Sequence, residues 1–277
     1  MKLSASIVLY NTKIDELKRV IDSYFAYTGE KQLFLVDNSP TDSLKEIVKI
    51  YPNNDIYYIF NNENMGYGKA HNIAIKKSIE QGLSYHIILN PDIIIKKGSL
   101  EKLTEYMEQH PEVGNIMPKI IYPNGELQYL CKLLPSPIDL IFRRFIPIKK
   151  WKDAINERYE LHSFGYDKIK NIPNLSGCFM FLRTEALKKV GLFDENIFMY
   201  LEDIDLNRRI HSKYKTIYYP DAIVIHEHQK ESYKNRKLLK AHIQSAIYYF
   251  NKYGWLFDKE RTAINKNVLK DLFKKLK

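Results

Sequence analysis

The chain has 277 residues, of which 45% are hydrophobic and 27% charged, and this composition excludes a chain that is disordered over most of its length. The formal net charge of +10 does not by itself indicate nucleic-acid binding, because its distribution is uneven. Residues 230–277 hold 13 Lys or Arg against 4 Asp or Glu, and residues 1–229 carry a net charge of only about +1. We therefore expect a nearly neutral body, residues 1–229, and a basic tail, residues 230–277.

The sequence pattern predicts neither a membrane-spanning segment nor a secretion signal. No stretch approaches the roughly 18 to 20 apolar residues that cross a bilayer, and the N-terminus leads directly into a strand-like pattern without a cleavage site. Two cysteines, Cys131 and Cys178, are too few for a disulfide framework or a zinc site and suit a reducing compartment. These features predict a cytoplasmic protein.

Strand-like and helix-like segments alternate along the first 90 residues. Short apolar runs predict buried strands, and apolar residues at helical spacing between them predict helices. This alternation predicts an α/β fold with a mostly parallel twisted sheet and helices on both faces. The expected strands cover residues 6–10, 33–36, 56–60 and 85–89, and the expected helices cover residues 13–27, 42–51 and 68–81.

Polar side chains follow each of the predicted strands. Ligands of such sheets bind outside the carboxyl ends of the strands, so these residues are the first indication of a site. A Rossmann dinucleotide site is not indicated, because the turn at residues 10–13 lacks glycine, and a turn into a helix explains Gly66-x-Gly68 equally well. The polar residues at the strand ends are Asn11, Asp37, Asn62, Asn64 and Asp92.

Acidic residues and histidines mark the second half of the chain. Glu202, Asp203 and Asp205 precede a short helix-like segment, where capping explains one or two of them. A carboxyl group among aromatic and apolar neighbours would instead have a raised pKa, as a general base requires. The strand-like residues 223–225 lead into His226-Glu227-His228, which does not by itself indicate a metal ligand.

Taken in order, these segments resemble glycosyltransferase family 2, and specifically its rhamnosyltransferase-like branch. The resemblance extends from about residue 4 to residue 228, and its last two blocks are the most specific. It implies a GT-A fold with a C-terminal helical appendage, and inverting transfer of a sugar from a nucleotide diphosphate donor with Mg²⁺ or Mn²⁺. The segments that carry it are SIVLYN, LVDNSPTD, NENMGYGKAHNIAI, ILNPDI, SGCFMFLRTEALKKVGLFDENIFMYLEDIDLNRR and PDAIVIHEH.

The resemblance also implies a metal site. Asn90-Pro91-Asp92 occupies the place of the family's Asp-x-Asp motif, with Asn90 where many relatives have the first acid. Asp92 would bind the metal, and His226 matches the late histidine that completes the site. Oxygen and imidazole ligands suit Mg²⁺ or Mn²⁺, with the donor diphosphate filling other positions.

Asp203 matches the family's catalytic base. It would take the proton from the acceptor hydroxyl as that oxygen attacks the anomeric carbon, and this single displacement inverts the configuration. Glu202 is expected on the acceptor side. For the nucleotide and diphosphate of the donor, the resemblance implies contacts from Tyr10, Asn11, Asp37, Asn64, Lys69, Asn72 and Asn90.

Two segments outside these motifs have open interpretations. Residues 133–151 mix apolar residues with Arg143 and Arg144, and are consistent with an acceptor-side flap, a membrane contact or an ordinary loop and helix. The tail pattern is typical of basic amphipathic helices that lie in a membrane interface, cover the body or form a homodimer. The apolar tail residues at helical spacing are Leu239, Ile243, Ala246, Phe250, Ile264, Val268, Leu272 and Leu276.

The resulting hypothesis is a metal-dependent glycosyltransferase of surface polysaccharide synthesis, for O-antigen or capsule. It would move L-rhamnose from dTDP-rhamnose to a lipid-linked or free glycan acceptor, as a peripheral protein on the inner face of the cell membrane. Transfer of galactofuranose, N-acetylglucosamine, glucose or galactose from a UDP donor would need no change in the motifs. The alternative from another class is a non-catalytic nucleotide- or nucleic-acid-binding protein, although we expect no nucleic-acid partner.

Overall fold

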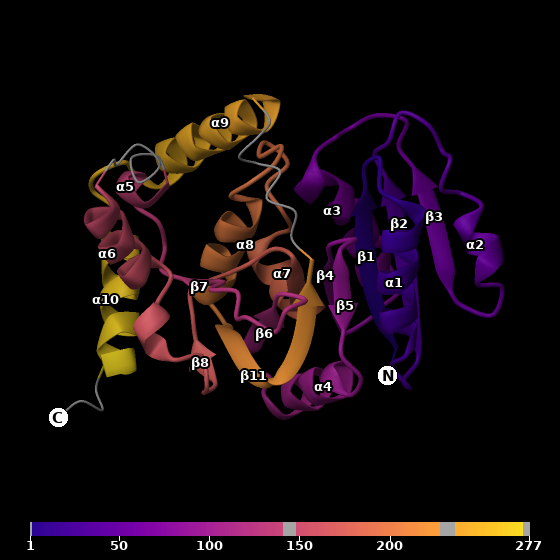
Figure 1. Ribbon diagram of the computed structural model, residues 1–277, viewed down its shortest axis with the longest axis horizontal. Helices are drawn as coiled ribbons and strands as arrows, with labels where there is room; N and C mark the ends of the chain where they lie inside the picture. Colours follow the sequence, from indigo (N-terminus) through magenta and orange to yellow (C-terminus); the bar gives the residue numbers. More distant parts are fainter. Residues whose placement is uncertain (1, 141–147, 228–235, 274–277) are drawn as a thin grey trace.

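The computed structural model describes residues 2–140, 148–227 and 236–273 (Figure 1). The apolar runs form strands of one large twisted sheet. These strands are β1 (Leu3–Leu9), β2 (Lys31–Asp37), β3 (Ile56–Phe60), β4 (Tyr85–Leu89), β5 (Ile93–Ile95), β6 (Val113–Ile121), β8 (Lys170–Asn171), β10 (Phe179–Arg183) and β11 (Lys215–His226). Two short strands, β7 (Cys131–Lys132) and β9 (Asn174–Leu175), pair with each other beside the sheet.

Across the large sheet the described strands lie in the order β3-β2-β1-β4-β10-β6-β11-β5, and β8 pairs with β11. The four N-terminal strands β1 to β4 are parallel, as is the β6–β11 pair, whereas β10 runs antiparallel to both of its neighbours. The expected α/β fold is therefore confirmed. Because the parallel strands end at one edge, the turns that follow them lie together.

Helices cover both faces of the sheet. They are α1 (Ile14–Phe25), α2 (Ile47–Ile50), α3 (Tyr67–Glu80), α4 (Ser99–Gln109), α5 (Pro137–Leu140), α6 (Lys149–Tyr159), α7 (Thr184–Val190), α8 (Glu202–His211), α9 (Arg236–Tyr253) and α10 (Lys259–Phe273). A 3₁₀ turn covers His162–Phe164. Helix α2 is shorter than the expected helix over residues 42–51, because that segment lies at the edge of the molecule and buries only Leu44 and Ile47.

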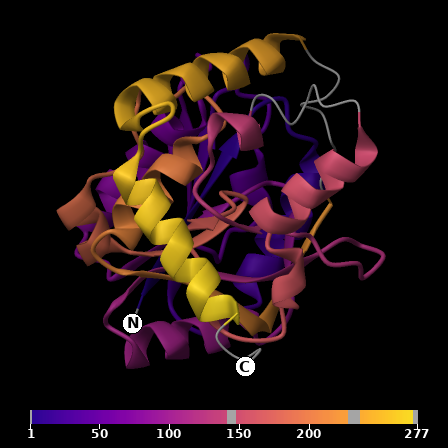
Figure 2. The same cartoon turned by 90° about the vertical axis from the view of Figure 1, so that its left-hand side faces the viewer.

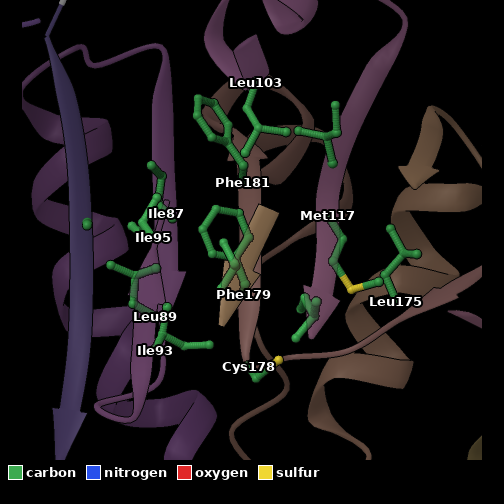
Figure 3. Packing of buried hydrophobic residues seen from close by; sticks show 14 of the residues in the cluster. Ile87, Leu89, Ile93, Ile95, Leu103, Met117, Leu175, Cys178, Phe179 and Phe181 are labelled. Atoms are coloured by element: carbon green, nitrogen blue, oxygen red, sulfur yellow. The ribbon is translucent and has the colours of Figure 1, made fainter. Parts of the chain in front are cut away.

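The central strands are buried on both faces, which explains their continuous apolar sequences. Figure 3 shows Phe179 and Phe181 of β10 beside Ile87 and Leu89 of β4, and all four side chains belong to the core shared with α1 and α4. Ile88, between the two β4 residues, points to the opposite face and packs in a second cluster under α3, α7 and α8.

The C-terminal helices pack on the rest of the chain. In Figure 2, α9 lies along the top of the molecule and α10 crosses the face toward the viewer. Ala246 and Phe250 of α9 are buried against the start of α8, and Val268 of α10 joins the main core. No helix within the described ranges is both long and apolar enough to cross a bilayer. Among residues highlighted by the sequence, Arg143, Arg144, His228 and Leu276 lie outside the described residues.

Candidate active site

A cavity of about 630 Å³ lies where the carboxyl ends of the strands meet. One part of its wall comes from the turns after β1 and β4, and another comes from the turn between β9 and β10 and the start of α8. The end of β11 and helix α9 also contribute, as do the turns after β2 and β3 and single residues of β7, α5 and α6. Of the residues expected in the site, the cavity brings together Tyr10, Asn11, Asn64, Asn90, Asp92, Glu202, Asp203 and His226.

Asp92 and His226 face each other in this cavity. Asp92 follows β4 in a tight turn, and His226 ends β11, where it pairs with Ile93 of β5. Glu227 N–H donates to the backbone oxygen of Asp92 (3.0 Å), which fixes the two chain segments together. The distance from Asp92 Oδ2 to His226 Nε2 is 3.4 Å. Residues distant in the sequence thus present one carboxylate and one imidazole to the same point.

Gln128 determines the orientation of the His226 ring. Gln128 Nε2 donates to the backbone oxygen of His226 (2.8 Å), and its Oε1 lies 2.9 Å from His226 Nδ1. Since Oε1 can only accept, Nδ1 carries a hydrogen and Nε2 faces Asp92. Burial alone would favour the neutral ring, but Cys178 and the Asp92 carboxylate raise the pKa of His226 to about 10.

The Asp92 and His226 side chains fit a divalent cation whose other ligands come from the substrate and water. A histidine that donates through Nδ1 to a fixed acceptor presents Nε2 as metal-ligating histidines do, and Asp92 supplies a carboxylate oxygen. Within the described ranges, no three His, Cys, Asp or Glu side chains gather closely enough to hold a metal by themselves. This agrees with Mg²⁺-type sites, where one or two protein ligands are supplemented by phosphate oxygens and water.

Asp203 lies at the first turn of α8 and is held by two backbone amides. Gly177 N–H donates to Asp203 Oδ2 and Ile204 N–H donates to Oδ1, both at 2.8 Å. A Cβ at Gly177 would lie 2.9 Å from the Asp203 Cβ, so only glycine permits this approach. Each carboxylate oxygen keeps a further lone pair that can accept a proton from a hydroxyl in the cavity.

Glu202 precedes Asp203 and is buried more deeply. Burial, followed by the negative charge of Asp203, raises the pKa of Glu202 to about 8. Burial also raises the pKa of Asp203, but its amide donors oppose that shift. The two carboxyl groups therefore differ in environment, with the proton favoured on Glu202 and the negative charge on Asp203.

Asparagines form the opposite wall near β1 and β2. Asn38 Nδ2 donates to the backbone oxygen of Gly66 (3.1 Å), and Asn64 Oδ1 accepts from Gly66 N–H (3.2 Å). Asn11 has a positive φ of 51°, and its N–H donates to Ser39 Oγ (2.9 Å). These bonds join the turns after β1, β2 and β3 into one polar surface beside Tyr10.

Three residues expected to contact the donor do not line the cavity: Asp37, Lys69 and Asn72. Asp37 is fully buried and accepts from Tyr58 Oη (2.5 Å) and Ser39 N–H (2.8 Å), so it supports the turn from below.

The side-chain amide of Asn72 is hydrogen-bonded to the backbone of Phe193. Its Nδ2 donates to the Phe193 oxygen, and its Oδ1 accepts from the Phe193 N–H (both 3.0 Å). Lys69 lies on the exposed side of α3. The Asn72 amide thus holds the loop before α8 in place, and its donor contact stays a prediction.

Two residues in or next to the cavity, Tyr67 and Gln128, were not among those expected from the sequence. Tyr67 lies within the Gly66-x-Gly68 pair, and its hydroxyl lies 2.9 Å from both Asn90 Oδ1 and the backbone oxygen of Gly177. Gln128 lies outside the cavity lining and matches no motif, and its role became visible only through its contact with His226. Sequence spacing could not indicate these roles, because each depends on a partner far along the chain.

Buried charges attach α8 to the C-terminal helices. Arg208 donates from Nη1 and Nη2 to the two carboxylate oxygens of Asp258 (2.7 and 2.8 Å), and both side chains are almost fully buried. Asp205, on the same helix, accepts from Tyr253 Oη at 2.7 Å. The helix that carries Asp203 is therefore positioned in part by residues after 250.

The sequence matches a known family over most of its length. Residues 4–191 match the model of the family described as Glycosyl transferase family 2. The chain is 30% identical over 209 residues to the N-acetylglucosaminyl-diphospho-decaprenol L-rhamnosyltransferase of Mycobacterium tuberculosis, covering 70% of this chain and 66% of that protein. It is 26% identical over 251 residues to the rhamnosyltransferase WbbL of Escherichia coli, covering 88% and 90% of the two chains.

A solved structure shares the fold. The crystal structure of GalNAc-T7 with UDP, GalNAc and Mn²⁺ superimposes with a TM-score of 0.61 at 18% identity, over 81% of this chain and 43% of that one. This chain thus spans about two thirds of the Mycobacterium tuberculosis protein and less than half of GalNAc-T7. At this identity the likeness to GalNAc-T7 shows the fold alone.

Proposed function

The chain belongs to glycosyl transferase family 2, in its rhamnosyltransferase-like branch, and from this we propose that it transfers a sugar from a nucleotide diphosphate donor to a glycan hydroxyl. The observation that supports this most is the approach of Asp92 to His226 (3.4 Å) in a cavity that Asp203 also lines. A cation-binding pair and a separate carboxylate base are the two parts that metal-assisted transfer from a diphosphate requires.

Asp92 and His226 are the proposed protein ligands of Mg²⁺ or Mn²⁺. When bound, the cation would neutralise the negative charge that develops on the departing diphosphate. The Mn²⁺ and UDP in the GalNAc-T7 structure support this proposal through the shared fold. In the absence of the cation, the proton on His226 would occupy the same position, and cation binding would displace it.

Asp203 is the proposed base. Its carboxylate accepts the proton of the acceptor hydroxyl while that oxygen forms a bond to the anomeric carbon and the bond to the diphosphate breaks. The amides of Gly177 and Ile204 orient the carboxylate and favour its ionised form. Attack from the face opposite the diphosphate inverts the sugar configuration. To Glu202, protonated beside Asp203 in the cavity lining, we assign a hydrogen bond donated to the acceptor.

On the donor side, we assign the nucleotide to the surface formed by Tyr10, Asn11 and Asn64. Asp37 acts from beneath this surface by holding the turn after β2. Lys69, exposed at the start of α3, lies outside the cavity lining and is a weaker candidate for a phosphate contact. Asn90 lies next to Asp92 and faces the diphosphate.

For the sugar and acceptor, we propose L-rhamnose from dTDP-rhamnose and a lipid-linked glycan. The names of two relatives specify rhamnosyl transfer, and one also names a diphospho-decaprenol acceptor. The net charge of +9 in residues 230–277 supports a contact of this tail with an anionic membrane surface, beside a catalytic body of residues 1–229. Assembly of O-antigen or capsule on the inner membrane face is the corresponding setting.

A panel of nucleotide sugars tests the proposal, with thermal stabilisation measured for dTDP-rhamnose, UDP-galactofuranose, UDP-N-acetylglucosamine, UDP-glucose and UDP-galactose, each with and without Mn²⁺. We expect Mn²⁺-dependent stabilisation by dTDP-rhamnose above the others. Preference for a UDP sugar would replace rhamnose in the proposal, and stabilisation by none of them would contradict it.

The base is tested separately with Asp203→Asn. This variant should bind the donor as the parent does but lose transfer by at least about a thousandfold, since the neutral amide cannot accept the proton. Turnover close to that of the parent would exclude Asp203 as the base.

A further inference from the structure

The hydroxyl group of Tyr67 joins the two sides of the cavity. Tyr67 begins α3, Asn90 follows β4, and Gly177 lies in the turn between β9 and β10. Tyr67 Oη is 2.9 Å from Asn90 Oδ1 and 2.9 Å from the backbone oxygen of Gly177. The amide of Gly177 in turn donates to Asp203 Oδ2. One hydroxyl thus links the residue beside the proposed cation ligand to the loop that holds the proposed base.

The phenol has one proton for these two oxygen neighbours. Burial raises the pKa of Tyr67 well above its usual value, so the hydroxyl keeps its proton and can donate it once. The Gly177 oxygen is a backbone carbonyl and can only accept. If Asn90 also offers oxygen, one of the two contacts at 2.9 Å brings lone pairs together without a proton between them.

Asn90 can resolve this conflict because its amide has a donor end and an acceptor end of nearly equal size. After a half turn, Nδ2 donates to Tyr67 Oη, and Tyr67 Oη donates to the Gly177 oxygen. Every member of the chain then has a partner. The same half turn turns the Asn90 oxygen away from Tyr67, in a side chain that lines the cavity together with Asp92.

We propose that Tyr67 is a positioning residue that orients Asn90, so that the side-chain oxygen of Asn90 faces the donor diphosphate and its cation. The role of this orientation toward a donor rests on the proposed function, whereas the hydrogen-bond geometry of Tyr67, Asn90 and Gly177 does not. It also explains why an amide suits this position better than a carboxylate. A carboxylate has no proton to donate to Tyr67, so it would draw the phenol proton away from Gly177.

Packing fixes the Tyr67 ring independently of its hydroxyl. Tyr67 N–H donates to the backbone oxygen of Phe198 (2.9 Å), and the ring meets His71 edge-on with 4.4 Å between ring centroids. Phe193 lies on a further side at 6.5 Å. Tyr67→Phe should therefore keep the ring in place and remove only the hydroxyl.

Hydrogen exchange of the Asn90 side-chain amide, followed by NMR in the protein without ligand, tests the orientation directly. Asn90→Asp identifies the signal by its loss. In the parent we expect exchange at least about tenfold slower than for an exposed asparagine, and in Tyr67→Phe we expect this protection to disappear. Tyr51→Phe, which removes a hydroxyl bonded to Asp22 outside the cavity (2.8 Å), should leave the Asn90 signal unchanged.

Binding of dTDP with Mn²⁺, measured by calorimetry, tests the consequence. Tyr67→Phe and Asn90→Asp should each weaken binding about fivefold to tenfold, and the double variant should be no weaker than the worse single variant, because both break one chain of bonds. Additive losses, tighter binding by Asn90→Asp, or an Asn90 amide that exchanges rapidly in the parent would each overturn the proposal. The exchange measurement needs no substrate, so it judges Tyr67 even if the transferase proposal fails.

Discussion

At the scale of single residues, adjacent carboxyl groups have unequal surroundings. Asp203 receives two backbone amide donors, whereas no hydrogen-bond partner is found for Glu202 Oε2 among the described residues. Ionising Glu202 therefore places a charge beside another charge in a buried position. The proton of the pair is therefore favoured on Glu202 and the negative charge on Asp203. These two environments are enough to produce this difference without a third titrating group.

Glu202→Gln should change how stability depends on pH. The pKa of Glu202 is raised to about 8 in the folded chain, while in the unfolded chain it is about 4.3. A raised acid pKa means that the folded state holds its proton longer, so this group lowers stability as pH rises from about 4 to 8. The variant should exceed the parent in unfolding free energy by at least about 1 kcal/mol at pH 8, and by less at pH 5.

Urea denaturation at the two pH values measures this difference. Glu46→Gln is the matched control, because Glu46 is exposed and its ion pair with Lys49 lies at the surface. A difference between the Glu202 variant and the parent that stays constant with pH would show that Glu202 is ionised in the folded protein.

Asp92→Ala should weaken Mn²⁺-dependent binding of dTDP by at least about tenfold, because it removes one of the two proposed protein ligands. Calorimetric titration with and without Mn²⁺ measures the effect, and binding without Mn²⁺ should change little. Asp221→Ala, on the solvent-facing part of β11, is the control. Equal Mn²⁺ dependence in the parent and Asp92→Ala would remove Asp92 from the metal site.

At the scale of helices and strands, the first four strands could be predicted because each contains a short apolar run, and β1, β2 and β4 are buried on both faces. The common location of the turn residues Asn11, Asn64 and Asp92 in the cavity lining could be predicted, because the strands before them end at one edge of the sheet. The pairing of β10 between β4 and β6 could not be predicted, since it depends on contacts between distant segments. For the same reason, the hydrogen bond of Asn72 to the loop at Phe193 could not be predicted.

Arg208→Met should destabilise the protein by about 3 to 5 kcal/mol, because it leaves Asp258 buried without its cationic partner. The Arg208 side chain also donates to Glu260 and lies 3.9 Å from the centre of the Tyr253 ring, so the pair belongs to a packed network. Chemical denaturation measures the loss, and the exposed Lys49 changed to Met should alter stability by less than about 0.5 kcal/mol. An unchanged midpoint for Arg208→Met would mean that α8 does not depend on this contact.

At the scale of the whole molecule, the basic tail has its apolar side turned inward. Ala246, Phe250 and Val268 pack against the body, so these helix faces are not available to a bilayer. Ile243 and Ile247 of α9 remain about two-fifths exposed, but the most exposed apolar side chains of the described tail lie between α9 and α10, where Leu256 is 79% and Phe257 93% exposed. A membrane contact through the tail would therefore involve this loop and the surrounding lysines.

Leu256→Ser combined with Phe257→Ser should reduce co-sedimentation with phosphatidylglycerol liposomes by at least about tenfold. The double variant loses the favourable free energy of transferring two apolar side chains into the membrane interface. Ile50→Ser, half-exposed on α2, is the control. Removing all residues after Tyr253 would be a poor substitute, because that deletion also removes the partner of Arg208. Undiminished binding of the double variant would argue against a role for this loop.

The lining of the cavity is divided along the chain, and this has an evolutionary consequence. Among the described residues, one wall comes from residues 8–92 and the other from residues 130–242, while α4 lies between them in the sequence and contributes to neither. Gene recombination within α4 would therefore join the half with the proposed nucleotide surface from one parent to the half with the proposed acceptor side from another. Chimeras of paralogues built at this crossover would combine their specificities as separate modules, provided that Asp92 and His226 are kept on either side of the junction.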